Sequence, residues 1–346
     1  MPHDDARRGS AESVAVVVVN YNTREHLRAC LTSVVAESPA EIVVVDNGSS
    51  DGSVEMVRSA FPTVRVVEDP SNPGYGAASN RGVAACTAPY IVLINSDTLL
   101  HPGTLEALGD FMDRHPRAAI AGPRLVHADG SPHRSCYAFP STTFLILEHS
   151  PLRRAAGWIP PLRRRYFIDW SPPAARAVPW VHGAVLMLRR SAFEAVGGFD
   201  PSFYMYYEEV DLAYRLAAAG WETYYAPVAQ VTHVGGASTS KAPIAMKERN
   251  FKSLIQFGVT HMTPTETTRL AATLQALIVA KLAVERVHRG LVRDPARRQE
   301  LDARVALWRH LARVPFVREA SKLRAARAAG GNAAPSAQNA PHAGVP

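Results

Sequence analysis

One stretch with chemical potential is N-P-G-Y-G-A-A-S-N, residues 72–80, which follows a short apolar run. A Gly-x-Gly between a strand and a helix is typical of a loop that holds phosphate against a helix N-terminus. A dinucleotide fold instead places three glycines directly after its first strand. Here N-Y-N-T-R-E follows the first apolar run, and Ser79 occupies the third glycine position. Hydride transfer with a dinucleotide is therefore disfavoured.

A second stretch, Y-Y-E-E-V-D-L at residues 206–212, could supply a general base. On a helix Glu208 and Asp211 share a face, whereas Glu209 is turned by about 100° from Glu208. A carboxylate placed in this way could accept the proton of a hydroxyl group. The plain alternative is a solvated acidic helix paired to Arg215, and taken alone these residues favour that alternative.

Strands that alternate with helices must position these groups. Apolar, β-branched runs predict buried strands at 14–20, 41–46 and 90–97, and a short strand at 64–68. With helices between them, these strands predict an α/β fold with a doubly wound, mostly parallel sheet. Ligands bind beyond the carboxyl ends of the strands in such sheets, where Asn20, Asp46 and Asp97 all fall.

The remaining pattern is less regular. The Pro- and Arg-rich residues 124–178 predict a flexible insert, since a loop of that length is typically a lid or disordered. Apolar runs then predict one strand over 180–190, a helix over 206–219, and short strands over 221–226 and 229–234. A helical pattern runs from about 264 to 328. Residues 1–12 and 329–346 are predicted to be disordered.

Taken in order, seven stretches over about residues 13–240 resemble family 2 glycosyltransferases of the GT-A fold, especially their rhamnosyltransferase-like branch. The stretches are V-V-V-V-N-Y-N, V-V-V-D-N-G-S-S-D-G-S, N-P-G-Y-G-A-A-S-N-R-G, L-I-N-S-D-T, W-V-H-G-A, G-G-F-D-P-S-F-Y-M-Y-Y-E-E-V-D-L and V-T-H-V-G-G. The resemblance implies a GT-A domain over 13–262 and a basic helical extension over 263–328. Within the domain it implies a nucleotide-binding half at about 13–123, the insert, and an acceptor half at about 179–262.

The resemblance also implies roles for individual residues. N-S-D matches the family's D-x-D motif, with Asn95 in place of the first acid and Asp97 kept as a ligand of Mg²⁺ or Mn²⁺. His233 matches a histidine that often completes the metal site, and Glu209 matches the catalytic base, where Asp is commoner. The implied donor-binding residues are Asn20, Tyr21, Asp46, Gly74, Gly76, Asn80, Arg81, Asn95 and Asp97. The implied acceptor-binding residues are Trp180, His182, Gly183, Ala184, Glu208 and Asp211.

Several of these roles have a plain structural alternative. Asp97 could merely cap the next helix, His233 could be a structural histidine, and Arg81 could form a surface salt bridge instead of facing a diphosphate. The function expected from the resemblance is an inverting, metal-dependent transfer of a sugar from a nucleotide-diphospho-sugar to a glycan or polyprenyl-linked glycan acceptor. The expected donor is dTDP-L-rhamnose. A UDP-hexose donor and a non-catalytic sugar-nucleotide- or membrane-binding module are the alternatives.

Charge and cysteine content set the expected location. The three cysteines form no close pair, which suits a reducing compartment, and no apolar run is long enough to cross a bilayer. The net charge of +7 is concentrated in 263–329, which carries 14 Lys and Arg against 6 Asp and Glu. No aromatic residues interleave these charges as in a base-stacking surface, so a lipid surface is favoured over nucleic acid. The sequence thus predicts a cytoplasmic protein, with a peripheral place on the cytoplasmic face of the inner membrane as the further expectation.

The apolar residues of the helical extension, 263–328, allow more than one packing partner. Its apolar stripe contains Leu270, Leu274, Leu277, Ile278 and Leu282. This stripe could pack on the parent domain, pair with a second subunit as a homodimer, or lie on a membrane surface. Trp158 and Ile159, between two Arg clusters, could also touch lipid headgroups.

Overall fold

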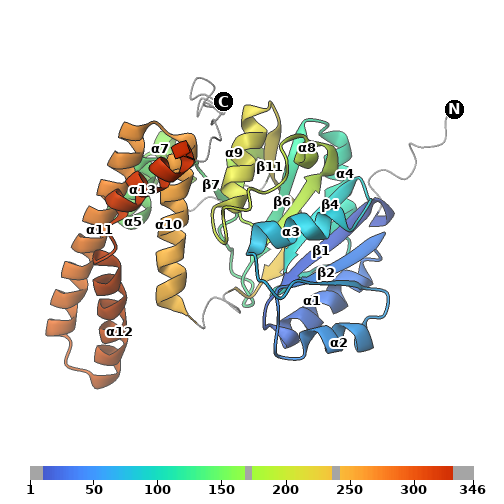
Figure 1. Cartoon of the computed structure of the whole chain (residues 1–346), viewed down its shortest axis with the longest axis horizontal. Coiled ribbons are helices and arrows are strands. Elements are labelled where there is room, and N and C mark those ends of the chain that lie inside the picture. The colour runs from blue at the N-terminus through green and yellow to red at the C-terminus, as the bar shows by residue number, and fades with distance from the viewer. Residues whose placement is uncertain (1–10, 168–173, 236–241, 330–346) are drawn as a thin grey trace. The chain divides into compact units, whose positions relative to one another are not determined.

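The computed structural model describes residues 11–167, 174–235 and 242–329 (Figure 1). Most of the two terminal segments predicted to be disordered lies outside these residues, and residues 11–13 form a short 3-10 helix. The described residues form two compact units. The first, which we call the sheet unit, contains residues 11–139 and 174–235. The second, the helical unit, contains 140–167 and 242–329.

A nine-stranded sheet forms the centre of the sheet unit, in the order β3-β2-β1-β4-β10-β6-β11-β5, with β8 paired to β11. The strands are β1 (Val14–Asn20), β2 (Glu41–Asp46), β3 (Arg65–Glu68), β4 (Tyr90–Asn95), β5 (Thr98–Leu100), β6 (Ala118–Val126), β8 (Arg176–Val178), β10 (Val185–Arg189) and β11 (Glu222–His233). Strands β3, β2, β1 and β4 pair in parallel, as do β6 and β11, whereas β10, β5 and β8 run against their neighbours. The predicted α/β, mostly parallel sheet is therefore confirmed.

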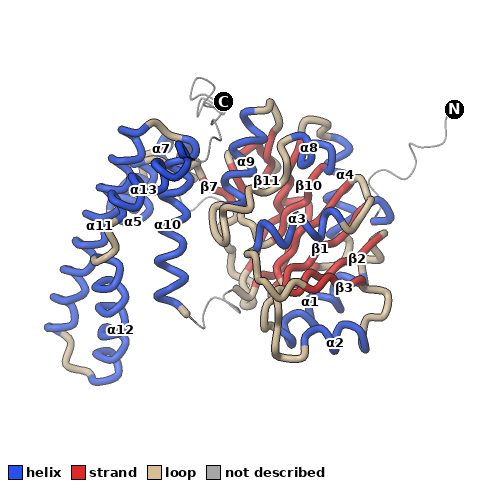
Figure 2. The backbone as a smooth tube through the Cα atoms, viewed as in Figure 1, coloured by secondary structure: helices blue, strands red, loops and turns tan. Residues whose placement is uncertain are grey.

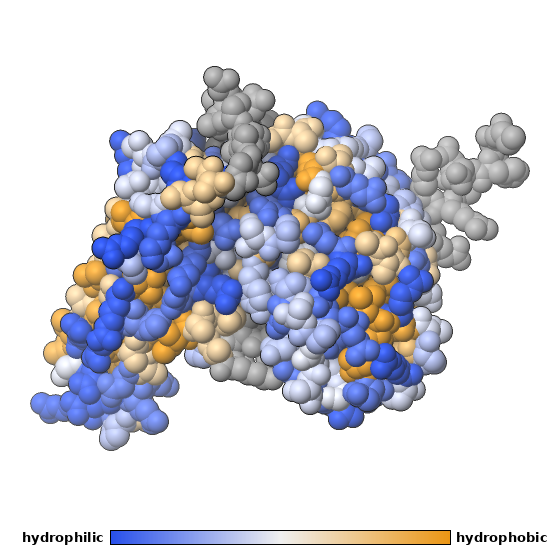
Figure 3. All heavy atoms as spheres, viewed as in Figure 1, coloured by the Kyte–Doolittle hydropathy of each residue, from blue (hydrophilic) through white to orange (hydrophobic). Residues whose placement is uncertain are grey.

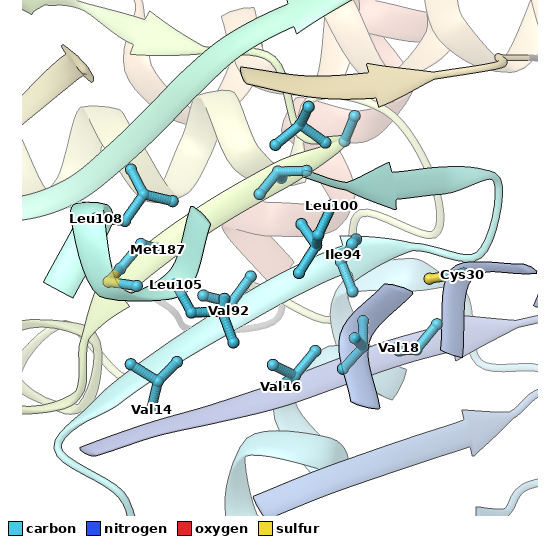
Figure 4. Packing of buried hydrophobic residues seen from close by; sticks show 14 of the residues in the cluster. Val14, Val16, Val18, Cys30, Val92, Ile94, Leu100, Leu105, Leu108 and Met187 are labelled. Atoms are coloured by element: carbon cyan, nitrogen blue, oxygen red, sulfur yellow. The ribbon is translucent and has the colours of Figure 1, made fainter. Parts of the chain in front are cut away.

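Helices cover both faces of this sheet (Figure 1). They are α1 (Arg24–Ala36), α2 (Ser53–Ala60), α3 (Tyr75–Ala84), α4 (Thr104–Arg114), α8 (Arg190–Ala195) and α9 (Glu208–Ala218). Alternate side chains of β1 explain the two layers. Val14, Val16 and Val18 belong to a core with leucines of α1 and α4. Figure 4 shows these valines with Leu105 and Leu108 of α4. Val17 points to the opposite face, where Gly82 of α3 lies so close that an added Cβ would sit 2.3 Å from it.

The predicted strand over 180–190 is two strands in the structure. β9 (Trp180–Val181) pairs with β7 (Cys136–Tyr137) in a separate two-stranded sheet, and β10 begins only at Val185. Residues 182–184 between them leave the strand direction, so that His182 and Gly183 line a cavity. An apolar run does not reveal such a break, because both halves are buried.

The helical unit consists of α5 (Thr142–His149), α6 (Leu152–Gly157), α7 (Pro160–Tyr166), α10 (Pro243–His261), α11 (Pro264–Leu291), α12 (Pro295–Ala312) and α13 (Phe316–Ala329) (Figure 2). The apolar stripe of α11 packs inside this unit: Leu270, Leu274, Ile278 and Leu282 are at most 8 % exposed. Helix α11 contacts α5, α10, α12 and α13. The stripe is therefore not the surface that a membrane or a second subunit would cover.

Several element predictions need correction. Residues 124–178, predicted as an irregular insert, contain the end of β6 and helices α5 to α7, and α10 was not predicted. The density of proline and arginine in 124–178 favoured a loop, although proline fits the first turn of a helix, as in α7 and α10, where its missing N–H is not needed. Helix α9 begins at Glu208, since Tyr206 and Tyr207 have positive φ angles of 67° and 69°. The two strands predicted over 221–234 form one strand, β11, with an irregularity between Tyr225 and Gln230.

Candidate active site

A cavity of about 320 Å³ opens in the sheet unit beyond the carboxyl ends of β1 and β4. Ten residues predicted as site residues line it: Asn20, Tyr21, Gly74, Asn95, Asp97, His182, Gly183, Glu208, Glu209 and His233. Eight other lining residues received no role from the sequence: Val19, Asn47, Asn72, Tyr75, Ser96, Tyr204, Met205 and Tyr206. Tyr75 and the tyrosine-rich segment, residues 204–207, both lie inside the quoted motifs. Their place in these motifs was the signal by which they could have been identified.

A buried polar network holds the end of β1. Nδ2 of Asn20 donates hydrogen bonds to Oδ2 of Asp46 at 2.8 Å and to Oγ of Ser49 at 3.0 Å. The hydroxyl of Thr23 donates to Oδ1 of Asn20 at 2.6 Å and lies 2.8 Å from the hydroxyl of Ser96. Asp46 is only 2 % exposed and does not line the cavity, although a direct contact with the nucleotide was predicted for it. Its carboxylate instead orients Asn20, which does line the cavity.

Asp97 and His233 lie side by side at the cavity wall. Nε2 of His233 is 3.4 Å from Oδ1 of Asp97, and the two residues are 6 % and 8 % exposed. The pairing of β5 with β11 places His233 opposite Thr98, and the Val234 amide donates to the Asp97 carbonyl at 3.0 Å. A carboxylate oxygen and an imidazole nitrogen at this spacing form a suitable ligand set for a divalent cation.

The glycine loop, residues 72–76, contacts the tyrosine-rich segment, residues 204–207, that precedes α9. Gly74 has φ of 94°, and an added Cβ would lie 2.0 Å from the carbonyl oxygen of Tyr204. The amide of Tyr75 donates to that same carbonyl at 2.9 Å. Only glycine permits this approach, because it lacks a Cβ and adopts the conformation without steric cost. The loop and the tyrosine-rich segment therefore form one wall of the cavity.

Three predicted donor-binding residues make structural contacts instead of lining the cavity. Asn80 forms two hydrogen bonds with the backbone of Phe199, at 2.8 and 2.9 Å. Gly76 packs against Phe199, since an added Cβ would lie 3.1 Å from its side chain. Arg81 forms an ion pair with the buried Asp69, so the salt-bridge alternative describes its position. The structure places none of the three among the cavity-lining residues.

The paired acids Glu208 and Glu209 begin α9 and face the cavity. In each, Oε2 is buried and has no hydrogen-bond partner among the described residues. Burial raises the pKa of Glu209 to about 7. Burial and the neighbouring Glu209 charge together raise the pKa of Glu208 well above its ordinary value. A carboxyl group with a pKa near neutrality is poised to accept a proton at physiological pH.

Tyr75 completes the surroundings of these acids. Its hydroxyl donates to the carbonyl of Gly183 at 3.4 Å. Burial, followed by the charges of Glu208 and Glu209, raises the pKa of Tyr75 above its ordinary value. The phenol therefore stays protonated and can donate a hydrogen bond.

The predicted acceptor-binding residues separate into two groups. His182 and Gly183 line the cavity, and Gly183 packs against Glu209, whose Oε1 would lie 3.4 Å from an added Cβ. Ala184, Trp180 and Asp211 do not line it. Trp180 stacks on Tyr137 with ring centroids 4.4 Å apart.

Asp211 pairs with Arg215, as the structural alternative to a substrate-binding role predicted, although Asp211 is buried and not solvated. It is fully buried, and Nε of Arg215 donates to its Oδ2 at 2.8 Å. Arg215 also donates to the carbonyls of Val196 and Gly198 at 2.6 and 2.7 Å. The pair thus ties α9 to the turn before it, and this turn leads to the tyrosine-rich segment.

His233 also belongs to a group of three histidine rings that come from distant segments of the chain. The ring centroids of His133, His182 and His233 lie 4.9 to 5.4 Å from one another. Burial and the neighbouring histidines lower the pKa of His133 to about 4 and that of His182 to about 3. His133 received no predicted role, because it lies in the segment predicted to be an irregular insert.

The site thus combines a buried carboxylate–imidazole pair, a carboxyl group with a near-neutral pKa, and a phenol donor in one cavity. This arrangement suits the binding of an anionic ligand with a cation and the removal of a proton from a hydroxyl group. The dinucleotide alternative gains no support, because the loop after β1 carries Asn20 and Tyr21 instead of glycines.

Comparisons with known proteins place the chain in a family. The model of "Glycosyl transferase family 2" matches residues 15–170. An N-acetylglucosaminyl-diphospho-decaprenol L-rhamnosyltransferase of Mycobacterium tuberculosis is 34% identical over 258 residues, covering 70% of this chain and 82% of that protein. A pre-mycofactocin glycosyltransferase of the same species is 32% identical over 230 residues, covering 65% of this chain and 43% of that protein.

Among solved structures, a mannosyltransferase of Pyrobaculum calidifontis in complex with GDP-Man and Mn²⁺ shares 20% identity with this chain. It aligns with a TM-score of 0.48 over 96% of this chain and 80% of its own. The sequence relationship to the rhamnosyltransferase is the stronger finding, because it joins substantial identity to coverage of most of both chains. The chain belongs to glycosyl transferase family 2 and is a nucleotide-sugar glycosyltransferase.

Proposed function

We propose that this enzyme is an inverting, metal-dependent rhamnosyltransferase that uses dTDP-L-rhamnose and acts on a glycan or polyprenyl-linked glycan in cell-surface polysaccharide synthesis. The observation that carries the proposal is a single cavity lined by the Asp97–His233 pair and by Glu209, whose pKa is about 7. The choice of sugar and acceptor is supported by the relative named as a rhamnosyltransferase of a lipid-linked sugar.

In this proposal Glu209 removes the proton of the acceptor hydroxyl as that oxygen attacks the anomeric carbon opposite the diphosphate. Inversion follows from attack on the face away from the leaving group. Such a base accounts for roughly 10²- to 10⁴-fold of the rate. Tyr75, kept protonated beside the acids, donates a hydrogen bond within the same pocket. Burial and the Glu209 charge raise the pKa of Glu208 and so favour its protonated form, which limits the negative charge in the site.

The residues present fit a divalent cation, because Asp97 and His233 supply an oxygen and a nitrogen 3.4 Å apart at the cavity wall. Mg²⁺ typically takes one or two carboxylates plus phosphate oxygens, whereas imidazole favours Mn²⁺. A bound cation would neutralise charge on the departing nucleoside diphosphate. Asn95 stands at the end of β4, where its amide can hydrogen-bond the nucleotide, whereas the amide of Asn20 is held by Asp46, Ser49 and Thr23.

The acceptor side of the cavity is rich in aromatic groups. Tyr204 and Tyr206 line it next to Met205, directly before the acids. Aromatic faces with a few polar groups are typical linings for ligands of this size. We propose that the tyrosine-rich segment holds the acceptor sugar against Glu209.

A panel of nucleotide sugars tests the donor. We expect saturable, cation-dependent binding and slow hydrolysis of dTDP-L-rhamnose, with UDP-hexoses and GDP-mannose bound more weakly. Tighter binding of a UDP-hexose would replace the proposed donor while keeping the enzyme class. Binding without hydrolysis or transfer to any acceptor would favour a non-catalytic binding module.

We also propose a peripheral contact with an anionic membrane through the helical unit. No helix in the described part of the chain is long and apolar enough to cross a bilayer. At the junction of α6 and α7, Trp158 is 88 % exposed and Ile159 47 % exposed. The flanking arginines are Arg153, Arg154, Arg163, Arg164 and Arg165. An exposed tryptophan among arginines suits the interface of an anionic bilayer, where a polyprenyl-linked acceptor would lie.

A second set of exposed apolar residues in this unit lies on α11: Val279, Val284, Val287 and Leu291. Figure 3 shows hydrophobic residues among hydrophilic ones over α11 and α12. They offer an alternative contact surface, either for lipid or for a second copy of the chain. Vesicle binding by variants of each surface distinguishes the two.

A further inference from the structure

Among the residues that the structure describes, His133, His182 and His233 form a group able to hold a metal ion. One ligand nitrogen from each lies within 4.8 Å of the others. Asp97 does not belong to this group, although it neighbours His233. We propose that these three imidazoles form a site for a late first-row divalent cation such as Co²⁺ or Zn²⁺. Because the site shares His233 with the donor-cation pair, it rests in that respect on the proposed function.

The fold brings the three histidines together from distant parts of the chain. His233 ends β11, which pairs with β6 so that Thr232 lies opposite Val126. The turn after β6 closes with the amide of His133 donating to the carbonyl of Leu125 at 3.0 Å. The amide of His182 donates to the carbonyl of Ser135 at 3.0 Å, next to the β7–β9 pair. Backbone hydrogen bonds therefore set all three positions.

The ring of His133 is already arranged as a ligand. Its Nδ1 lies 3.0 Å from the carbonyl of Arg134, and since a carbonyl only accepts, Nδ1 carries the hydrogen. Nε2 of a neutral ring then keeps its lone pair for a cation. A metal-bound histidine typically donates its other N–H to a carbonyl or carboxylate in this way.

His233 contributes a nitrogen that lacks a partner. Its Nδ1 is buried and has no hydrogen-bond partner among the described residues, while Nε2 faces Asp97. A buried polar atom without a partner costs free energy. A cation in the histidine group would compensate this cost.

His182 is the least prepared of the three. Its Nδ1 accepts a hydrogen bond from the amide of Ala184 at 3.1 Å, so a cation must compete for that nitrogen or the ring must turn over. Metal–nitrogen bonds of about 2.0–2.1 Å place tetrahedral ligands roughly 3.4 Å apart, so the nitrogens, which lie within 4.8 Å of one another, must approach by up to about 1.4 Å. We therefore expect His133 to contribute more to affinity than His182.

The nature of the ligands determines which cations bind. Three neutral imidazoles suit zinc, cobalt and nickel, whereas magnesium requires oxygen ligands. This preference separates the site from one built on Asp97, which both Mg²⁺ and Mn²⁺ accept. It predicts cation binding in the absence of any nucleotide.

The test is a titration of the full chain, free of any histidine tag and of nucleotide, with Co²⁺ followed by visible absorption and then by displacement with Zn²⁺. We expect one equivalent of Co²⁺ to bind with the absorption of nitrogen-ligated cobalt, and Mg²⁺ not to displace it. His133→Ala should weaken binding by at least about tenfold, since loss of even an outer-shell partner has effects of that size. His182→Ala should weaken it less.

Two variants sharpen the result. His127→Ala removes a ring 4.6 Å from that of His133 but outside the group, and it should leave Co²⁺ affinity unchanged. Asp97→Asn should also retain Co²⁺ binding. If Asp97→Asn removed binding while His133→Ala did not, the cation would sit at the carboxylate–imidazole pair and the three-histidine site would be refuted.

Thermal unfolding of each variant checks that it is folded, and His133→Gln replaces the alanine variant if that one unfolds. Absence of Co²⁺ binding by the wild-type chain would equally overturn the inference. Because the readout is metal binding without donor, this outcome is distinct from a failure of the donor panel to show sugar-nucleotide turnover.

Discussion

Nε2 of His233 lies 3.4 Å from Oδ1 of Asp97, although the two residues are 136 positions apart in the sequence. The register of β11 on β5 creates this contact, because it sets His233 opposite Thr98. The pair shares a cavity with Glu209, so a cation-binding group and a proton acceptor face the same ligand space. The following predictions test this arrangement.

Replacing Glu209 with Gln keeps the size of the side chain and removes its ability to accept a proton. We expect the turnover number for sugar transfer to fall by roughly 10²- to 10⁴-fold, with donor affinity nearly unchanged. Glu194→Gln, at an exposed acid of α8, is the matched control and should retain full activity. Normal turnover by Glu209→Gln would remove Glu209 as the base.

The rate of transfer should depend on the ionisation of Glu209. Its pKa of about 7 means that the carboxylate, the active base, predominates only above that pH. The rate should therefore rise with pH through a midpoint near 7 and fall roughly tenfold per pH unit below it. Donor binding measured over the same range separates ionisation of the base from loss of substrate. A rate constant that is flat between pH 5.5 and 8 would contradict this assignment.

Asp97→Asn and His233→Ala each remove one proposed cation ligand. We expect both to weaken cation-dependent donor binding by at least about tenfold, as measured by calorimetry at saturating Mg²⁺ or Mn²⁺. Asp113→Asn is the control, because Asp113 accepts a hydrogen bond from Tyr90 away from the cavity. If Asp97→Asn bound the donor as tightly as the wild type with cation present, the proposed ligand role would be wrong.

Gly74→Ala should damage both stability and activity. The new Cβ would meet the Tyr204 carbonyl at 2.0 Å, and the φ of 94° is strained for alanine. We expect a loss of about 3 kcal/mol or more in the free energy of unfolding by urea. Gly103→Ala has a comparable φ of 79° with nothing within 4 Å, so it isolates the backbone strain, at about 1 kcal/mol. Equal effects of the two substitutions would show that the close contact between Gly74 and the Tyr204 carbonyl does not contribute to stability.

Membrane contact is tested by co-sedimentation with vesicles. We expect binding to vesicles containing phosphatidylglycerol, little binding to neutral phosphatidylcholine vesicles, and weaker binding at high salt. The double variant Trp158→Ala/Ile159→Ala should lose most of the binding, whereas Val284→Ala/Val287→Ala on α11 should retain it. The reverse pattern would move the contact to α11, and no binding by the wild type would end the membrane proposal.

Much of the sheet could be predicted because its signal is local. Strands β1, β2 and β4 are continuous apolar, β-branched runs, and such runs are buried on both faces whatever surrounds them. The polar residues that end these runs, Asn20 and Asp97, must then lie at the ligand-binding edge. Helices α6 and α7 were harder to predict, because the prolines at their starts lie in a Pro- and Arg-rich segment and proline can break a helix as well as begin one.

The sequence by itself determined the family, the strands and helices from β1 to β4, and the acids and glycines able to serve a sugar nucleotide. The tertiary structure alone decided which of these side chains reach the cavity. Asp46, Asn80 and Asp211 have polar side chains that could bind a substrate. In the structure these side chains hydrogen-bond to Asn20, Phe199 and Arg215 respectively.

Tertiary structure also decided that His133 joins His182 and His233. The physical reason is that contacts between distant segments depend on strand register and on the path of loops. Neither is encoded in the local periodicity that predicts a strand or a helix.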